Sequence, residues 1–223
     1  MILMRILIYG AGVIGSLYAA LFAEAGYDTS IYARGKRFEA LRNNGLLYKK
    51  NQEVIKAEIR ILGELPNDDI YDFVLLTVRE NQLYEALIEL KNNKSNTIVT
   101  MINSLDSYNK WEDIVGKGRI LPAFPGAGGS INNDGILDAA LTPGLIQPTT
   151  FAEISGNKSE RTKQFSEILR HAHIPYKKVM DMHLWQLCHL AMKAPDEMRE
   201  LHKQFYAYIK RMKKCGCKTK KVL

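Results

Sequence analysis

A glycine pattern near the start of this 223-residue chain limits its fold more than any other feature. Gly10-Ala11-Gly12-Val13-Ile14-Gly15 matches G-x-G-x-x-G, and it follows an apolar run over residues 5–9. The run predicts a buried strand, and the Ala- and Leu-rich residues 13–25 predict a helix. A second strand predicted over 29–33 completes a βαβ unit. In that context the pattern predicts a dinucleotide-binding turn.

Each position in the turn has a distinct task. Gly10 permits the tight turn, Gly12 lets the backbone approach a pyrophosphate, and Gly15 lets the helix pack closely on the strand. The backbone around Val13 and Ile14 belongs to the start of the helix, where free amides and the helix dipole favour an anion. We therefore expect these residues to bind the cofactor.

The end of the second predicted strand distinguishes between two cofactors. A carboxylate there would accept hydrogen bonds from the ribose hydroxyls of NAD. This chain has Arg34 instead, followed by Lys36 and Arg37. A guanidinium can pair with a 2′-phosphate in a bidentate fork, so we expect NADP(H). The alternative is a solvated basic turn.

The remaining pattern predicts an α/β fold: a Rossmann-type parallel-sheet domain with a short all-helical C-terminal piece. Further strands are expected over 72–78, 97–101, 119–124 and 176–179, with helices over 36–43, 81–90 and 159–172. Residues 46–61 look like a hairpin or edge strands, and 125–129 like a glycine-rich turn. Residues 1–179 form the expected NADP-binding domain, and 180–223 a truncated helical substrate or dimerisation domain with helices over 182–193 and 197–214.

Composition argues against several classes of protein. The net charge is +7, but residues 210–223 hold seven basic residues and no acidic ones, which leaves 24 basic against 24 acidic residues elsewhere. We therefore expect no nucleic-acid partner. Apolar runs are too short to span a membrane, and no side-chain set has the spacing of a metal site. Three cysteines make no disulfide framework, so we expect a cytoplasmic protein.

Several residues together resemble the ketopantoate reductases (2-dehydropantoate 2-reductases), NADP-dependent enzymes of the pantothenate pathway. They are the glycine turn, Arg34, the segment 72–79 that ends at Arg79, and Asn103 after the next strand. Residues 156–179, leading to a helix with Trp185, resemble the junction with the family's C-terminal domain. The resemblance covers roughly residues 3–192.

The resemblance implies an NADPH-dependent reductase that transfers hydride to a small 2-keto acid such as 2-dehydropantoate. It places Arg79 and Asn103 at the cofactor and the substrate. Arg79 stands where the family has lysine and would polarise the carbonyl, while Asn103 would orient the nicotinamide or substrate. Aligned on Trp185, the family's catalytic lysine and asparagine become Leu187 and Ala191.

These substitutions leave alternatives open. One is an NADP(H)-binding protein that has lost catalysis. Another is an enzyme of the related 3-hydroxyacid dehydrogenase group, against which Leu187 counts equally. The apolar side chains of Leu184, Trp185, Leu187 and the pair Phe205-Tyr206 would either form a homodimer or pack on the first domain.

Overall fold

A computed structural model describes the backbone of residues 4–193 and the side chains of residues 4–190. The chain divides into two compact units, residues 1–182 and 183–223. The sequence placed this division after residue 179. The second unit contributes most of helix α6 (Met182–Lys193), and the predicted helix over 197–214, with Phe205 and Tyr206, lies outside the described residues.

The first unit is built on an eight-stranded main sheet in the order β12-β11-β8-β7-β6-β1-β2-β5. Its strands are β1 (Arg5–Tyr9), β2 (Asp28–Tyr32), β5 (Arg60–Leu62), β6 (Phe73–Leu76), β7 (Ile98–Met101), β8 (Ile120–Phe124), β11 (Thr149–Phe151) and β12 (Tyr176–Lys178). The six neighbouring strands β8, β7, β6, β1, β2 and β5 are parallel, and β11 pairs antiparallel with β8. The parallel part has the Rossmann strand order, so the expected fold class is confirmed.

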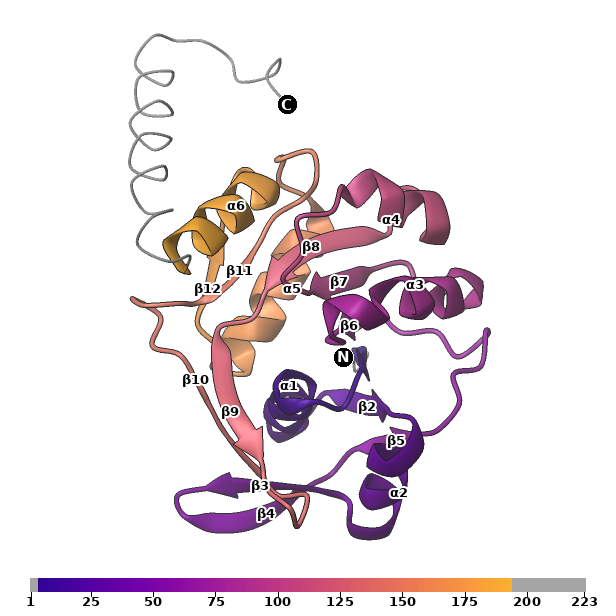
Figure 1. Cartoon of the computed structure of the whole chain (residues 1–223), viewed down its shortest axis with the longest axis vertical. Helices are drawn as coiled ribbons and strands as arrows, with labels where there is room; N and C mark the ends of the chain where they lie inside the picture. Colours follow the sequence, from indigo (N-terminus) through magenta and orange to yellow (C-terminus); the bar gives the residue numbers. More distant parts are fainter. Residues whose placement is uncertain (1–3, 194–223) are drawn as a thin grey trace, which may run out of the picture. The chain divides into compact units, whose positions relative to one another are not determined.

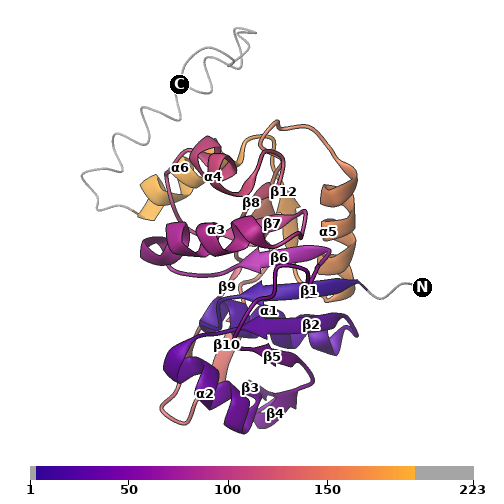
Figure 2. The same cartoon turned by 90° about the vertical axis from the view of Figure 1, so that its right-hand side faces the viewer.

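Helices cover both faces of this sheet (Figures 1 and 2). The first unit contains α1 (Val13–Glu24), α2 (Gly35–Asn44), α3 (Leu83–Asn92), α4 (Tyr108–Val115), α5 (Glu160–His171) and the short 3-10 helix η1 (Glu80–Gln82). Figure 2 shows α5 on one side of the sheet and α3 and α4 on the other. The alternation along β1 explains this arrangement: Ile6 and Ile8 join the core with α1 and α5, whereas Leu7 and Tyr9 point to the opposite face.

A second sheet, in the order β4-β3-β10-β9, lies against α1 (Figure 1). It joins two hairpins, β3 (Leu46–Lys50) with β4 (Glu53–Ala57), and β9 (Ala127–Ile131) with β10 (Leu137–Leu141). Leu137 pairs with Tyr48 to connect them. Helix α1 therefore lies between two sheets, and its residues from Gly15 to Ala20 are all buried.

The prediction of a glycine-rich turn over residues 125–129 was wrong. Ala127 to Ile131 form strand β9, paired antiparallel with β10. Glycine is needed because the two strands approach closely: a Cβ on Gly129 would lie 2.4 Å from the Cα of Ala139. Helix α4 was not expected from the sequence.

Among the described residues, no helix combines the length and the apolar character needed to cross a membrane.

Candidate functional site

The glycine turn lies where the order of the parallel strands reverses. From β1 the chain proceeds outward to β2 and β5, and it then returns to the other side of β1 at β6. In open α/β sheets, ligands bind at this point, beyond the carboxyl ends of the strands. Thr77, just after β6, donates its amide to the Tyr9 carbonyl at 2.9 Å and its hydroxyl to the Gly10 carbonyl at 2.8 Å. The loop is thus fixed to both strands.

The three motif glycines meet different surroundings. Gly10 has φ +114°, which a side chain rarely adopts. A Cβ on Gly15 would lie 2.0 Å from the Gly10 carbonyl oxygen and 2.5 Å from Thr77 Oγ1, so helix and strand could not approach as they do. A Cβ on Gly12, by contrast, would meet no atom within 4 Å. Gly12 therefore keeps a space open in front of the helix.

The start of α1 offers its backbone amides to that space. Gly12 is the N-cap residue and supplies no side chain to bond the first turn, and the first turn holds no acidic residue. The first amides of a helix, here those of Val13, Ile14 and Gly15, have no acceptor within the helix. An anion such as a pyrophosphate suits this arrangement chemically, because the amides and the helix dipole favour negative charge.

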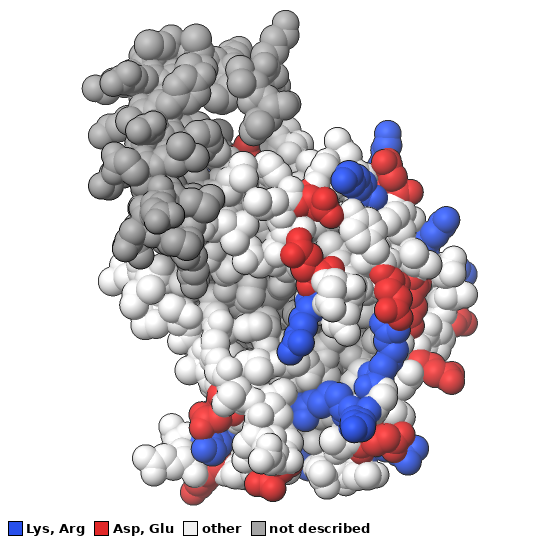
Figure 3. All heavy atoms as spheres, in the orientation of Figure 1, with Lys and Arg blue, Asp and Glu red and all other residues white. Residues whose placement is uncertain are grey.

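Arg34 stands after β2, as the sequence indicates, but it already has partners. Its Nη1 lies 2.5 Å from Glu85 Oε1, and its Nη2 lies 3.8 Å from Glu89 Oε2. Both glutamates belong to α3. The space-filling view shows basic and acidic side chains next to each other over α2 and α3 (Figure 3). The Arg34 side chain remains 45% exposed, so a ligand can reach it.

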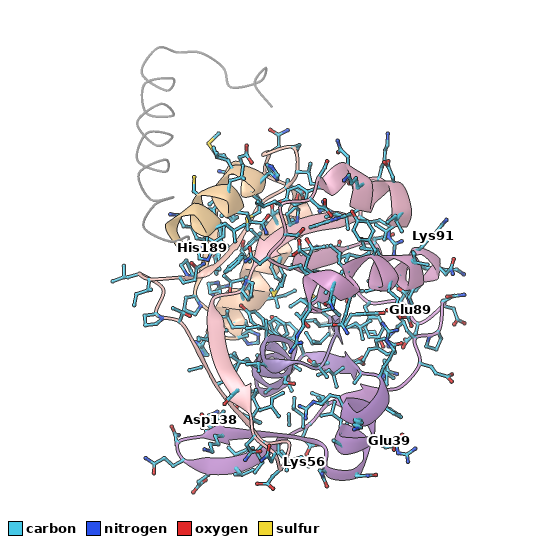
Figure 4. The ribbon with its side chains drawn as sticks, viewed as in Figure 1. Glu39, Lys56, Glu89, Lys91, Asp138 and His189 are labelled. Atoms are coloured by element: carbon cyan, nitrogen blue, oxygen red, sulfur yellow. The ribbon has the colours of Figure 1, made fainter. Side chains whose placement is uncertain are left out.

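Glu89, which Figure 4 labels on α3, has more hydrogen-bond partners than Glu85. It accepts hydrogen bonds from the hydroxyls of Tyr32, at 2.7 Å, and Tyr9, whose rings lie side by side with centroids 4.7 Å apart. Burial, and then the hydrogen bond to Glu89, raise the pKa of each tyrosine, so both hydroxyls stay protonated as donors. We call Tyr9, Tyr32 and Glu89 the tyrosine–glutamate cluster.

Two further cations follow Arg34 on the first turn of α2. Lys36 is exposed, and no carboxylate in the described part of the chain pairs with it. Arg37 reaches the glycine turn: it donates to the carbonyl of Ala11 at 3.0 Å and to Ser16 Oγ at 3.3 Å. Burial lowers the pKa of Arg37, although it stays far above neutrality for a guanidinium. Arg37 thus braces the loop, and Lys36 supplies a free positive charge.

Arg79 and Asn103 follow neighbouring strands of the sheet. Arg79 comes after β6 as the N-cap residue of η1, and Asn103 comes after β7, which pairs with β6. Both residues are exposed. They therefore lie beyond the same edge of the sheet as the glycine turn. Leu187 lies on α6, in the second unit.

Four residues of the site were not found from the sequence: Tyr9, Tyr32, Glu85 and Glu89. The sequence features that mark these residues were present, but they are not specific to a binding site. Both strands end in tyrosine, and the two glutamates stand four apart on a predicted helix, which puts them on one face. Nothing in the sequence links that face to Arg34.

Comparison with known proteins agrees with this geometry. The family model described as "Ketopantoate reductase PanE/ApbA" matches residues 6–148. A 2-dehydropantoate 2-reductase of Mesorhizobium japonicum is 35% identical over 105 residues, which cover 46% of this chain and 32% of the relative. One from Archaeoglobus fulgidus is 27% identical over 180 residues, covering 80% and 57%. The chain thus spans about a third to just over half the length of these relatives.

Solved structures share the fold. A 2-dehydropantoate 2-reductase from Geobacter metallireducens superposes with a TM-score of 0.73 at 17% identity, covering 89% of this chain and 71% of that one. A D-mandelate dehydrogenase solved with NADH and anilino(oxo)acetate gives a TM-score of 0.71 at 16% identity, covering 84% and 60%. With the family model matching more than half of its residues, the chain belongs to the ketopantoate reductase PanE/ApbA family.

Proposed function

We propose that this protein binds NADP(H) at the glycine turn. The observation that carries the proposal is the start of α1: an uncapped helix behind Gly12, with open space in front of it. Gly10, Gly12 and Gly15 shape the turn, and the amides of Val13 and Ile14 would hold the pyrophosphate. Membership of the family and the NADH bound in the related dehydrogenase support a nicotinamide cofactor.

The preference for NADP(H) over NAD(H) rests on the residues after β2. Arg34 is the N-cap residue of α2, and the first turn of that helix has no acidic residue. A 2′-phosphate there would meet the Arg34 guanidinium, the Lys36 ammonium and the positive end of the helix dipole. The carboxylate that would suit NAD is absent from this position of β2, although Glu85 reaches it from α3.

Replacing Arg34 tests the cofactor. Arg34→Ala should weaken NADPH binding by about tenfold or more, because a bidentate charged contact to phosphate is lost, and should change NADH binding little. Fluorescence titration of each nucleotide measures both affinities. Arg42→Ala is the matched control, since Arg42 lies farther along α2 and pairs with Glu39. Equal losses for both nucleotides would contradict the NADP(H) assignment.

We further propose that the protein reduces a small 2-keto acid such as 2-dehydropantoate. The cofactor would supply hydride, and a cation beside the carbonyl oxygen would stabilise the negative charge that develops there. Arg79 is the cation placed to polarise that carbonyl, and Asn103 the amide placed to orient the nicotinamide or the substrate. Their shared edge of the sheet and the named relatives support these roles.

A second candidate function is NADP(H) binding without reduction. When the chain is aligned with the family on Trp185, Leu187 on α6 stands in for the catalytic lysine, and a leucine cannot donate a proton. Mixing the protein with NADPH and 2-dehydropantoate, and following the loss of nicotinamide absorbance, separates the two. Turnover above background supports the reductase. Tight NADPH binding with no turnover supports the second candidate.

The C-terminal segment stays part of the proposal. We propose that residues 180–223 contribute to substrate binding or to pairing of two copies. Sedimentation of the wild type and of Trp185→Ala tests the pairing: a monomeric wild type would contradict it.

A further inference from the structure

Arg34 faces two glutamates that differ in how firmly they are held. Glu89 has both carboxylate oxygens bonded to tyrosine hydroxyls, and its side chain is 31% exposed. Within residues 4–190, Glu85 bonds Arg34 alone, and its side chain is 68% exposed. The two residues are one helical turn apart on α3. One carboxylate is therefore fixed in the tyrosine–glutamate cluster, and the other is free to leave.

The ion pair between Arg34 and Glu85 is exposed, so it is weaker than the hydrogen bonds that hold Glu89 to the two tyrosines. An ion pair between exposed side chains contributes little, because water screens both charges and the long side chains lose freedom. A phosphate carries more negative charge than a carboxylate and accepts more hydrogen bonds from a guanidinium. A 2′-phosphate would therefore displace Glu85 from Arg34. Glu89 cannot follow, because leaving would break two hydrogen bonds to Tyr9 and Tyr32.

We infer that Glu85 competes with the cofactor's 2′-phosphate for Arg34 and so sets the preference between NADPH and NADH. The inference rests on the proposed NADP(H) function. In the free protein the Glu85 carboxylate is bonded to the Arg34 guanidinium. Glu89 and the hydroxyl of Tyr9, which lies 3.2 Å from Arg34 Nη2, hold the arginine in position. Binding of NADPH exchanges the Glu85 carboxylate for phosphate. Binding of NADH, which lacks that phosphate, leaves the pair intact.

Glu85→Gln tests this role. We expect it to lower the Kd for NADPH by about three- to tenfold, since it removes the carboxylate that competes with the phosphate for Arg34. The Kd for NADH should change by less than about twofold, so the ratio of the two affinities moves. Glu80→Gln is the matched control for net charge. Glu80 is exposed on η1, and no side chain in the described part of the chain forms an ion pair with it. It should change neither Kd.

A double-mutant cycle with Arg34→Ala distinguishes competition from general repulsion. Without the guanidinium there is nothing to compete for, so Glu85→Gln should then improve NADPH binding by less than about twofold. An equal improvement in both backgrounds would overturn the inference, and so would an unchanged NADPH affinity in Glu85→Gln alone. A wild type that binds NADPH no better than NADH, in the same titrations, would instead overturn the proposed cofactor.

Discussion

Two helices of the first unit, α1 and α5, are each 12 residues long and pack into the same hydrophobic core, yet they begin in opposite ways. Helix α1 begins at Gly12 with no side-chain cap and no acidic residue in its first turn. Helix α5 begins at Ser159, whose side chain accepts from the amide of Thr162 in a capping box, and Glu160 lies in its first turn. Helix α1 leaves the amides of its first turn without a side-chain acceptor, whereas the Ser159 side chain accepts from an amide of α5.

This difference distinguishes a helix start that can bind a ligand from one that serves only to stabilise the fold. A serine cap stabilises a helix by about 1 kcal/mol relative to alanine, and α1 lacks one. Burial between two sheets holds α1 in place instead. The start of α5 is reinforced further by Arg161, which bonds both carboxylate oxygens of Glu153. The start of α1 therefore leaves its first amides available to a ligand, a property it shares with the uncapped starts of α2, α3 and α4 and not with α5.

Gly15→Ala should have the largest effect. The added Cβ would meet backbone and Thr77 at 2.0 and 2.5 Å, so α1 must move away from β1, and we expect a loss of about 3 kcal/mol in the free energy of unfolding. Urea unfolding measures it. Gly26→Ala, with nothing within 4 Å of its added Cβ but a positive φ of +83°, serves as the comparison and should cost less. A Gly15→Ala variant as stable as wild type would contradict the close packing.

Glu153→Gln should destabilise the start of α5 by about 2 kcal/mol at neutral pH, since Arg161 loses its buried charged partner. Burial alone would raise the pKa of Glu153, but the hydrogen bonds from Arg161 and Ser159 together lower it. Because the pKa is lower in the folded protein, the ionised Glu153 stabilises the fold at every pH above the ordinary pKa of 4.5. This stabilisation is lost as the pH falls through the lowered pKa. The difference in the free energy of unfolding between wild type and variant should therefore become smaller at acidic pH. A gap that is independent of pH would contradict the ionic origin.

Gly12→Ser gives α1 a start like that of α5. The backbone at Gly12, with φ −75° and ψ −169°, already suits serine, so stability should stay within a few tenths of a kcal/mol or rise slightly. The new hydroxyl would occupy an amide and the space in front of it, and NADPH binding should weaken about tenfold, or ~1.4 kcal/mol. Paired titration and urea unfolding check both halves. Unchanged NADPH binding would remove α1 from the site.

Ser159→Ala should have the smallest effect, a loss of about 1 kcal/mol in stability with NADPH affinity unchanged. The capping box is lost, but no ligand depends on it. Thermal unfolding together with a nucleotide titration is the measurement. A change in NADPH affinity here would mean that the two helix starts are coupled.

Local patterns predicted the βαβ unit well, because its signals are short-range. The apolar run over β1, the glycine turn and the alanine-rich α1 each occupy consecutive residues, and predicted and observed bounds differ by one residue at most. Strand β9 was missed for the opposite reason. Its glycines are typical of turns, and what makes them a strand is pairing with β10, whose backbone lies too close to Gly129 for a side chain there.

The site shows the same limit. Gly10, Gly12 and Gly15 could be assigned because their tasks follow from a motif. The charge at Arg34 could be predicted, but its neighbours could not, since Glu85 is 51 positions away along the chain and reaches Arg34 only once α3 has packed on the sheet. Tyr9 and Tyr32 read as ordinary strand residues until Glu89 is placed between their hydroxyls.

The double-sided burial of α1 also determines where this protein can adapt. A helix enclosed by sheets on both sides, with every residue from Gly15 to Ala20 buried, cannot shift to suit a different ligand without disturbing two cores at once. Its first turn is in effect a fixed reference point. Variation in which nucleotide is accepted must then arise in the exposed segments that follow β2 and β6, where single substitutions disturb little packing.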